Sequence, residues 1–427
     1  MGMFPLFIAR RIYNRPADGA ARQGATPPAI RIAVAAVAIG LAVMIVAVAV
    51  VVGFKREIEA LVGRTAGHIH VEALADNSHY ETTPLCVDDS LLDALKARPG
   101  YCEVSTYATK LCVLKTDSAF QAIGLTGEAP DRDWTFYTRH NESGTHPANP
   151  DEIYLPRPIA SSLKLKTGDE VKAYFVKREG AHDINTWNAG GASVKVRTLR
   201  VSGIYATHFS EADSRQAVCL LPLLQDVAGW DDDMVSGVKI RLDDYARAQT
   251  EWERLTELLY GRSDRTGMPY RIRTTDTVYP QIFGWLSLLD TNVWVILILM
   301  GTVAAITMIS GLLIIILERT ATIGILKALG CPDGELRKIF LWVSGLLTLK
   351  GLLWGNVIGL GFCAVQYMWH PLTLDPENYY LEWVPVGLSL WHVVALNLGT
   401  AAVILLTMLI PSGIVSKISP SQAILSE

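Results

Sequence analysis

Charged residues are scarce in this 427-residue chain, since Asp, Glu, Lys and Arg make up only 19% of it while hydrophobic residues make up 50%. Soluble domains carry about 25% charged residues, so this composition excludes a soluble enzyme and a disordered protein. The formal net charge of −4 provides no basic surface, which excludes a nucleic-acid-binding domain. Six cysteines are too few for a disulfide scaffold. The charge deficit is concentrated in a few long apolar runs.

Four apolar runs are long enough to cross a membrane: residues 32–52, 293–317, 339–369 and 393–410. A hydrocarbon core about 30 Å thick needs about 20 residues of helix. Helices are expected because backbone groups in lipid must be paired within the segment. The third run contains Lys350, which either has a function or extends its ammonium group to the membrane surface.

Lysine and arginine predict the orientation of these runs. Five arginines precede the first run, and four Lys or Arg residues lie between the second and third, whereas residues 370–390 contain none. Because positively charged short loops stay on the cytoplasmic side, we expect both termini to be cytoplasmic. Residues 54–292 then lie on the opposite side. Residues 3–13 mix apolar residues with arginines and predict an amphipathic helix in the cytoplasmic interface.

Residues 54–292 predict an α+β domain with two strand–helix–strand units. The first has a strand at 68–71, a helix starting near Asp88 and a strand from 104 onward. The second runs from a strand at 237–242 to a strand at 270–273. Trp252, Leu255 and Leu259 share one face of the helix between these two strands, which is the pattern of an amphipathic helix.

A β-rich insert, about residues 129–225, separates these units. We expect a hairpin over 109–124, just before it, and strands at 170–176 and 194–205 within it. The Gly- and Asn-rich stretch 182–193 predicts an exposed loop, which is either functional or a solvated hairpin tip. Helical stalks should join the domain to the membrane. They would pack through a seam of apolar residues: Phe54, Ile58, Leu61 and Val62 after the first run, and Ile282, Leu286, Leu289 and Val293 before the second.

The segment Glu-Arg-Thr-Ala-Thr-Ile-Gly-Ile-Leu-Lys-Ala-Leu-Gly, residues 318–330, directly follows the second run. It predicts a short cytoplasmic helix that Gly330 would end as the C′ residue. Such a helix could dock into a cleft on a soluble partner and carry force to the spans. The alternative from the residues alone is an ordinary loop.

This segment resembles the coupling-helix motif of FtsX/MacB-type ABC permeases. Residues 336–341 and the ending 411–424 also resemble that family. Residues 7–11 and 52–58 are more narrowly similar to the lipoprotein-releasing permeases of the LolC/LolE group. The resemblance covers the four spans and their flanks well and the insert poorly.

The resemblance implies a permease subunit that works with two ATPase subunits and a second permease subunit, the same or homologous. The chain has no G-x-x-x-x-G-K-[ST] phosphate loop, so another chain must hydrolyse ATP and this one is expected to be non-catalytic, without a cofactor. The expected function is release of lipoproteins from the cell inner membrane to a periplasmic carrier. The remaining expected partner is membrane lipid, with no nucleic acid.

Three sets of site residues are expected. The coupling residues and the carrier contact follow from the resemblance, whereas the cavity follows from the need of acyl chains for an apolar path, between spans one and two of two protomers. The ATPase-coupling residues would be Glu318, Arg319, Thr320, Ile323, Gly324, Leu326, Lys327, Ala328 and Gly330. The lipoprotein cavity would be lined by Met44, Val46, Val48, Val50, Ile296, Leu297, Met300 and Val303. By position in the insert, the carrier contact would involve Asp183, Asn185, Trp187 and Asn188.

Two other functions of the wider family stay open: a MacB-like mechanotransmitter that drives efflux or export, and an FtsX-like regulator of a periplasmic hydrolase. A metal site at His68, His70 and His79 is disfavoured because no Cys or carboxylate completes the ligand spacing. Residues 231–233, three aspartates, lack the alternation of a calcium loop. One disulfide could form among Cys86, Cys102, Cys112 and Cys219, whose pairing the sequence does not specify.

The expected fold is an α-helical membrane protein with four transmembrane helices and an α+β periplasmic domain. Its parts would be a cytoplasmic N-terminal segment 1–31, transmembrane helix 32–53, periplasmic domain 54–292, transmembrane helix 293–317, coupling helix and loop 318–338, transmembrane helix 339–369, periplasmic loop 370–390, transmembrane helix 391–410 and cytoplasmic tail 411–427.

Overall fold

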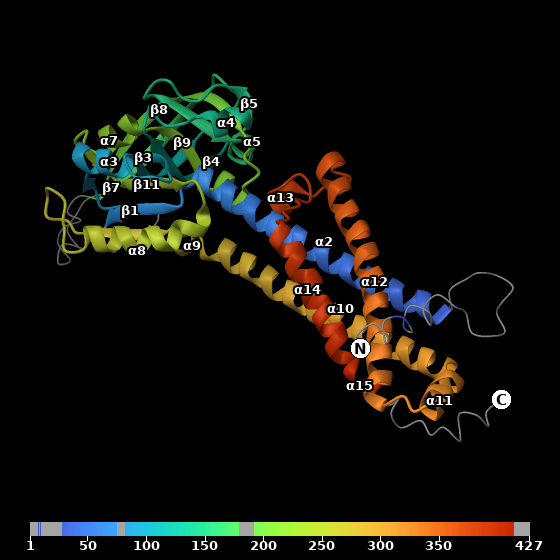
Figure 1. Cartoon of the computed structure of the whole chain (residues 1–427). Coiled ribbons are helices and arrows are strands. Elements are labelled where there is room, and N and C mark those ends of the chain that lie inside the picture. Colours follow the sequence, from blue (N-terminus) through green and yellow to red (C-terminus); the bar gives the residue numbers. More distant parts are fainter. Residues whose placement is uncertain (1–6, 8, 10–27, 75–81, 179–191, 414–427) are drawn as a thin grey trace. The chain divides into compact units, whose positions relative to one another are not determined.

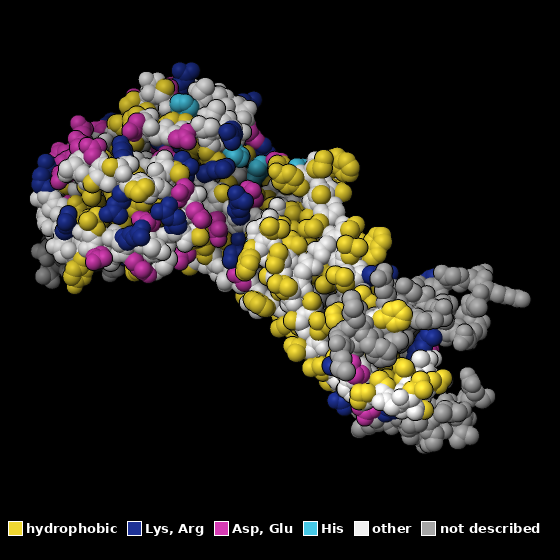
Figure 2. All heavy atoms as spheres, viewed as in Figure 1, with side chains coloured by type: hydrophobic (Ala, Val, Ile, Leu, Met, Phe, Trp, Pro, Cys, Tyr) yellow, Lys and Arg dark blue, Asp and Glu magenta, His cyan; other side chains and the backbone are white. Residues whose placement is uncertain are grey.

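A computed structural model describes Phe7, Ala9 and residues 28–74, 82–178 and 192–413 (Figure 1). The chain divides into two compact units. The membrane unit comprises Met1–Arg56, Gly284–Thr373 and Trp383–Glu427, and the sheet domain comprises Glu57–Phe283 and Leu374–Glu382. Hydrophobic side chains cover the long helices, whereas Lys, Arg, Asp and Glu gather over the sheet domain (Figure 2).

Four helices in the described part of the chain are long and apolar enough to cross a membrane. Their bounds are α2 Pro28–Thr65, α10 Pro280–Glu318, α12 Asp333–Trp369 and α14 Leu390–Thr407. Short helices α11 Thr320–Ala328 and α15 Leu409–Ser412 complete the membrane unit. Helices α2 and α10 have 38 and 39 residues, so each is roughly 57 Å long and exceeds the hydrocarbon thickness. The expected stalks are therefore continuations of these helices.

Within the membrane unit, α2 and α10 contact each other through side chains. Phe54 and Trp285 meet edge to face with ring centroids 5.4 Å apart. Lys55 forms an ion pair with Asp290 at 2.8 Å. Of these four residues only Phe54 belongs to the predicted apolar seam. The packing of the stalk helices on a second protomer stays a prediction.

A stripe of three glycines lets α12 approach α2 closely. Gly351, Gly355 and Gly359 are spaced by four residues and all are buried. A Cβ at Gly355 would stand 2.9 Å from the Ala38 carbonyl oxygen and 2.9 Å from Leu41 Cβ. Small residues at such spacing allow helix backbones in lipid to pack at short distance.

Two asparagines join α12 to α14 inside the apolar layer. Asn356 Nδ2 donates to Asn397 Oδ1 at 2.7 Å, and Asn397 Nδ2 donates to Asn356 Oδ1 at 3.0 Å. Each amide also donates to a carbonyl one turn earlier in its own helix. The pair therefore satisfies most of the hydrogen-bonding capacity of both side chains without water.

We expect Asn356→Leu to lower the stability of the membrane unit by about 0.6–2 kcal/mol, because Asn397 loses its interhelical partner. The measurement is unfolding of the purified chain in mixed detergent micelles. In the double variant Asn356→Leu/Asn397→Leu the loss should be smaller than the sum of the two single losses. Additive losses would contradict a coupled pair.

In its described residues, the sheet domain has twelve strands, ten of them in one sheet. The strands are β1 Ile69–Ala73, β2 Leu85–Cys86, β3 Tyr101–Lys115, β4 Phe120–Glu128, β5 Asn141–Gly144, β6 Glu152–Pro156, β7 Glu170–Arg178, β8 Ala192–Tyr205, β9 Gln216–Leu220, β10 Met234–Val235, β11 Gly237–Leu242 and β12 Tyr270–Thr274. Its helical elements are α3 Asp89–Lys96, α4 Thr135–Arg139, α5 Arg157–Leu163, α6 Ser210–Asp213, α7 Leu221–Ala228, η2 Tyr245–Arg247, α8 Ala248–Leu259, α9 Thr275–Val278 and α13 Pro376–Tyr379.

Six of these strands close into a ring through the pairs β3–β4, β4–β9, β9–β6, β6–β8, β8–β7 and β7–β3. Apolar side chains such as Leu114, Ile123 and Phe175 fill its interior. Strand β3 connects this ring to the rest of the sheet, because its first half pairs with β11 and its second half with β4 and β7. Tyr107 lies at the change of partner.

The predicted elements appear with shifted bounds. The expected strands at 68–71, 170–176, 194–205, 237–242 and 270–273 correspond to β1, β7, β8, β11 and β12, and the hairpin at 109–124 to β3 and β4. Asp88 precedes α3 but makes no side-chain cap hydrogen bond. The insert is not a separate layer, since its strands join the sheet of the flanking units. Within the loop predicted at 370–390, residues 374–382 pack with the sheet domain.

Candidate functional site

Helix α11 connects α10 to α12 and has a well-defined end. Gly330 has φ +87°, its N–H donates to Lys327 O at 2.9 Å, and the Cys331 N–H donates to Leu326 O at 3.0 Å. These two bonds form a Schellman motif, so the predicted C′ role of Gly330 is found in the structure. Lys327 forms an ion pair with Asp333 at 3.0 Å, which joins α11 to the first turn of α12.

The two faces of α11 differ. Ile323 is 2% exposed and packs in the apolar cluster that includes residues of α2, α10 and α12. The opposite face carries Thr322, Ile325 and Leu329, with Ile325 55% and Leu329 79% exposed. A helix of nine residues thus presents an unpaired apolar edge beside charged groups, which is typical of a docking surface.

The predicted coupling residues fall on different sides of this helix. Ile323 and Gly324 face the bundle, whereas Leu326 and Lys327 are half-buried and Ala328 and Gly330 are exposed. Before the helix, Glu318 is exposed, Arg319 is half-buried, and the Thr320 hydroxyl donates to the carbonyl oxygens of Ile316 and Leu317. Sequence reasoning omitted Ile325 and Leu329, although their spacing of four residues places them on one face.

The predicted cavity residues do not form one open face of this chain. Met44 and Val48 are 4% and 8% exposed, and Met44 packs in a cluster with Leu41, Ile45 and Cys363. Val46, Val50, Ile296, Leu297 and Met300 are half-buried, and Val303 is exposed. The exposed apolar positions of α10 are neighbours that the sequence analysis did not select: Trp294, Val295, Ile298, Leu299 and Ile306. The predicted carrier contacts Asp183, Asn185, Trp187 and Asn188 lie outside the described residues.

A buried charge cluster holds the end of α2 in the sheet domain. Arg132, between β4 and α4, donates from Nη2 to the carbonyl oxygen of Arg64 at 2.8 Å. Arg132 also contacts Glu128 at 2.5 Å, and Lys239 of β11 contacts Glu128 at 2.8 Å. These two cations lower the pKa of Glu128 although burial opposes this. A cation at the C-terminus of a helix stabilises the orphan carbonyl groups there.

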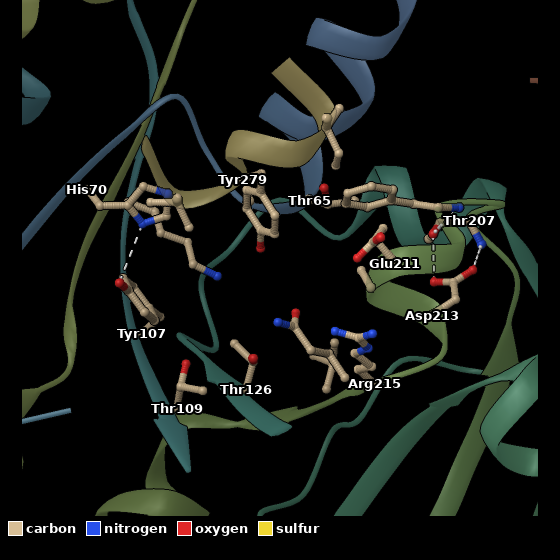
Figure 3. Close-up of a pocket in the computed structure, with 18 of the residues that line it drawn as sticks. Thr65, His70, Tyr107, Thr109, Thr126, Thr207, Glu211, Asp213, Arg215 and Tyr279 are labelled. Atoms are coloured by element: carbon tan, nitrogen blue, oxygen red, sulfur yellow. Dashed lines mark hydrogen bonds between the residues drawn. The ribbon is translucent and has the colours of Figure 1, made fainter. Parts of the chain in front are cut away.

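A cavity of about 300 Å³ lies beside this cluster, between the end of α2, the first turn of α10 and strands β3, β4 and β11 (Figure 3). Figure 3 shows Tyr279, Glu211 and Arg215 facing it. Asp213, 4% exposed, accepts hydrogen bonds from the Thr207 N–H and hydroxyl at 3.0 and 2.7 Å. The cavity therefore combines tyrosines with paired charges at the point where the stalk helices enter the domain.

The histidines and cysteines have structural contacts. His68 Nδ1 accepts from the Leu242 N–H at 3.0 Å, and burial lowers the pKa of His68 to about 4, so this ring is neutral at pH 7. Among the described residues, no group of three His, Cys, Asp or Glu could hold a metal ion, and His79 lies outside them. All six cysteines are described and all are free thiols, so the disulfide that the sequence allowed is not formed in this structure.

Comparison with known families identifies the membrane part. Residues 294–420 match the FtsX-like permease C-terminal family. The chain carries an FtsX-like permease domain. The match includes the apolar part of α10, the whole of α11 and α12, and α14. The exposed apolar edge of α11, Ile325 and Leu329, therefore lies within the matched region.

Relatives with curated names extend the match beyond this domain. The chain is 22% identical over 280 residues to the lipoprotein-releasing system transmembrane protein LolC of Xylella fastidiosa, covering 64% of each chain, less than two thirds of that protein's length. It is 21% identical to LolE of Haemophilus influenzae, covering 88% of each chain. It is 22% identical to LolC of Neisseria meningitidis, covering 92% of this chain and 93% of that one.

Solved structures align with part of the chain. The periplasmic region of MacB from Actinobacillus actinomycetemcomitans aligns with a TM-score of 0.32 and 13% identity, covering 52% of this chain and 95% of that one. The extracellular domain of the noncanonic ABC-type transporter YknZ from Gram-positive bacteria aligns with a TM-score of 0.31 and 14% identity, covering 48% and 99%.

Proposed function

We propose that this chain is the permease subunit of an ABC-type complex in the cell inner membrane, which releases lipoproteins to a periplasmic carrier. Two copies of a separate ATPase and a second permease subunit complete the complex. The observation that carries this proposal is the exposed apolar edge of α11, Ile325 and Leu329, directly after a membrane-spanning helix. The names of the LolC and LolE relatives support the choice of lipoprotein as substrate.

The geometry supports a route for force from α11. Its buried side packs in the cluster that includes α2, α10 and α12, so a displacement of α11 must move these helices. Helices α2 and α10 continue without a break beyond the length that a bilayer needs. In the sheet domain, Arg132 holds the end of α2. ATP-driven movement would reach the sheet domain through these rigid helices.

The energy of extraction argues for a protected path for the acyl chains. A triacylated lipoprotein buries roughly 40 methylene groups, and at about 0.8 kcal/mol each its transfer into water would cost roughly 30 kcal/mol. One or two ATP turnovers could hardly supply that. The chains must therefore move from lipid into another apolar surface, formed between permease subunits. The exposed residues Val295, Ile298 and Leu299 of α10 are candidates for that surface together with the half-buried Leu297 and Met300.

Reconstitution tests the proposal. The chain, its second permease subunit and the cognate ATPase are placed in proteoliposomes with a fluorescent triacylated lipoprotein, and a soluble carrier and ATP are added. We expect the lipoprotein to appear with the carrier only when ATP is hydrolysed. The control is an ATPase with an inactive nucleotide site. ATP hydrolysis without release, or stable capture of an outer-membrane channel or a cell-wall hydrolase instead of a carrier, would refute lipoprotein release.

A further inference from the structure

The segment Leu374–Glu382 belongs to the sheet domain by its packing, although both its ends continue into the membrane unit. The base of this segment is fixed. Gln366 of α12, 1% exposed, donates to the carbonyl oxygens of Leu372 and Val384 at 3.1 and 3.0 Å and accepts from the Leu372 N–H at 3.1 Å. The Val384 N–H donates to Leu372 O at 3.0 Å. Because both edges of the base are bonded to one α12 side chain, the segment must follow any movement of α12.

The tip of the segment contacts the turn before α6. Tyr380 and Phe209 meet edge to face with ring centroids 5.7 Å apart. Phe209 is 1% exposed and also meets Tyr279, which directly precedes α10, at 6.1 Å. Glu382 Oε1 lies 3.5 Å from His208 Nε2. Burial lowers the pKa of His208 despite Glu382. The edge-to-face ring contact does not depend on the charge of this imidazole.

Both sides of the contact have unusual backbone conformations. His208 has φ +61° and Tyr380 has φ +63°, a region that L-residues with side chains rarely adopt. The turn that contains His208 is held by Asp213, whose buried carboxyl accepts hydrogen bonds from the Thr207 N–H and hydroxyl (Figure 3). Burial raises the pKa of Asp213 to about 6 against these hydrogen bonds. Costly conformations persist where the surroundings determine them strongly, and they are frequent at switch regions.

We propose that Phe209 and Tyr380 form a coupling contact through which movement of α12 and α14 reaches the sheet domain. Helices α2 and α10 enter this domain directly, whereas α12 and α14 reach it through the segment Leu374–Glu382. Since α11 lies between α10 and α12, a push on α11 acts on both routes. Phe209 and Tyr380 are positioning residues. This proposal rests on the proposed function only because it needs an ATPase as the source of movement.

The first test measures amide hydrogen exchange of residues 374–382 in the full complex with its ATPase in lipid nanodiscs. Loss of the ring contact in Tyr380→Ala or Phe209→Ala should speed exchange of this segment about threefold to tenfold. The conservative variants Tyr380→Phe and Phe209→Tyr should restore slow exchange. Phe120→Ala is the matched control, because Phe120 is 77% exposed on β4. Unchanged exchange in both alanine variants overturns the contact.

The second test asks whether the contact transmits movement. In the wild-type complex, a non-hydrolysable ATP analogue should change the exchange of residues 207–213, and Tyr380→Ala should reduce that change to the part transmitted through α2 and α10 while leaving basal ATP hydrolysis intact. A full-sized change in Tyr380→Ala, or none in the wild type, overturns the coupling. Neither measurement uses lipoprotein, so a failure of lipoprotein release in reconstitution is distinguishable from a failure of this proposal.

Discussion

Replacing Ile325 by glutamate should detach the ATPase from this permease. Ile325 is 55% exposed on α11 and, in the described part of the chain, is not a member of the buried cluster that contains Ile323. At a docked interface the new carboxylate would lose its water without a partner, and central apolar contacts of this kind are worth about 2–4 kcal/mol. The dissociation constant of the ATPase should therefore rise roughly 30-fold to 1,000-fold. A titration of the purified ATPase against the nanodisc-embedded chain measures this dissociation constant.

The matched control is the isoleucine two positions earlier. Ile323 is 2% exposed, so Ile323→Ala should destabilise the bundle by about 2–4 kcal/mol, while Ile325→Ala should leave its melting temperature nearly unchanged. The affinity for the ATPase should change in the reverse order. When only folded protein is compared, Ile325→Ala should lose more affinity than Ile323→Ala. If Ile325→Glu bound the ATPase with wild-type affinity, the docking edge would lie elsewhere and the proposed function would lose its main support.

The sequence was sufficient for features that depend on local composition. The four spans follow from apolar length, and the end of α11 follows from Gly330, because only its backbone readily adopts φ +87°. The exposed face of α11 was not predicted. Ile323 and Ile325 are chemically identical, and which of them is buried depends on packing against distant helices.

Strand partners and loop contacts could be predicted less well from the sequence. Strand β3 changes partners near Tyr107, and nothing in its residues specifies that β7 and β8 close the ring with it. The contact of Tyr380 with Phe209 joins residues 171 positions apart in the chain, from two segments whose local patterns are those of loops. Such pairings arise from tertiary packing rather than from propensity.

The burial of Met44 could have been predicted from the glycine spacing in the third apolar run. The residue was expected to line a cavity between the spans of two protomers, yet it is 4% exposed within this one chain. The cause is the glycine stripe of α12, whose spacing of four residues is visible in the sequence and which brings α12 against α2 near Leu41 and Ile45. A small-residue stripe in one apolar run therefore predicts burial in another.

That stripe also gives the largest expected effect on the fold of the membrane unit. Gly355→Leu would place a side chain where even a Cβ stands 2.9 Å from the Ala38 carbonyl oxygen and 2.9 Å from Leu41 Cβ, so α2 and α12 must separate. Overpacking of this kind costs about 1–3 kcal/mol or more. The control lies in the same helix, since a Cβ at Gly361 meets nothing within 4 Å. Gly361→Leu should keep the melting temperature of the detergent-solubilised chain, whereas Gly355→Leu should lower it by several degrees. Because α2 carries force to the sheet domain in the proposed mechanism, Gly355→Leu should also reduce ATP-driven release. Equal melting temperatures for the two variants would mean that close approach of α2 and α12 is not what holds the bundle together.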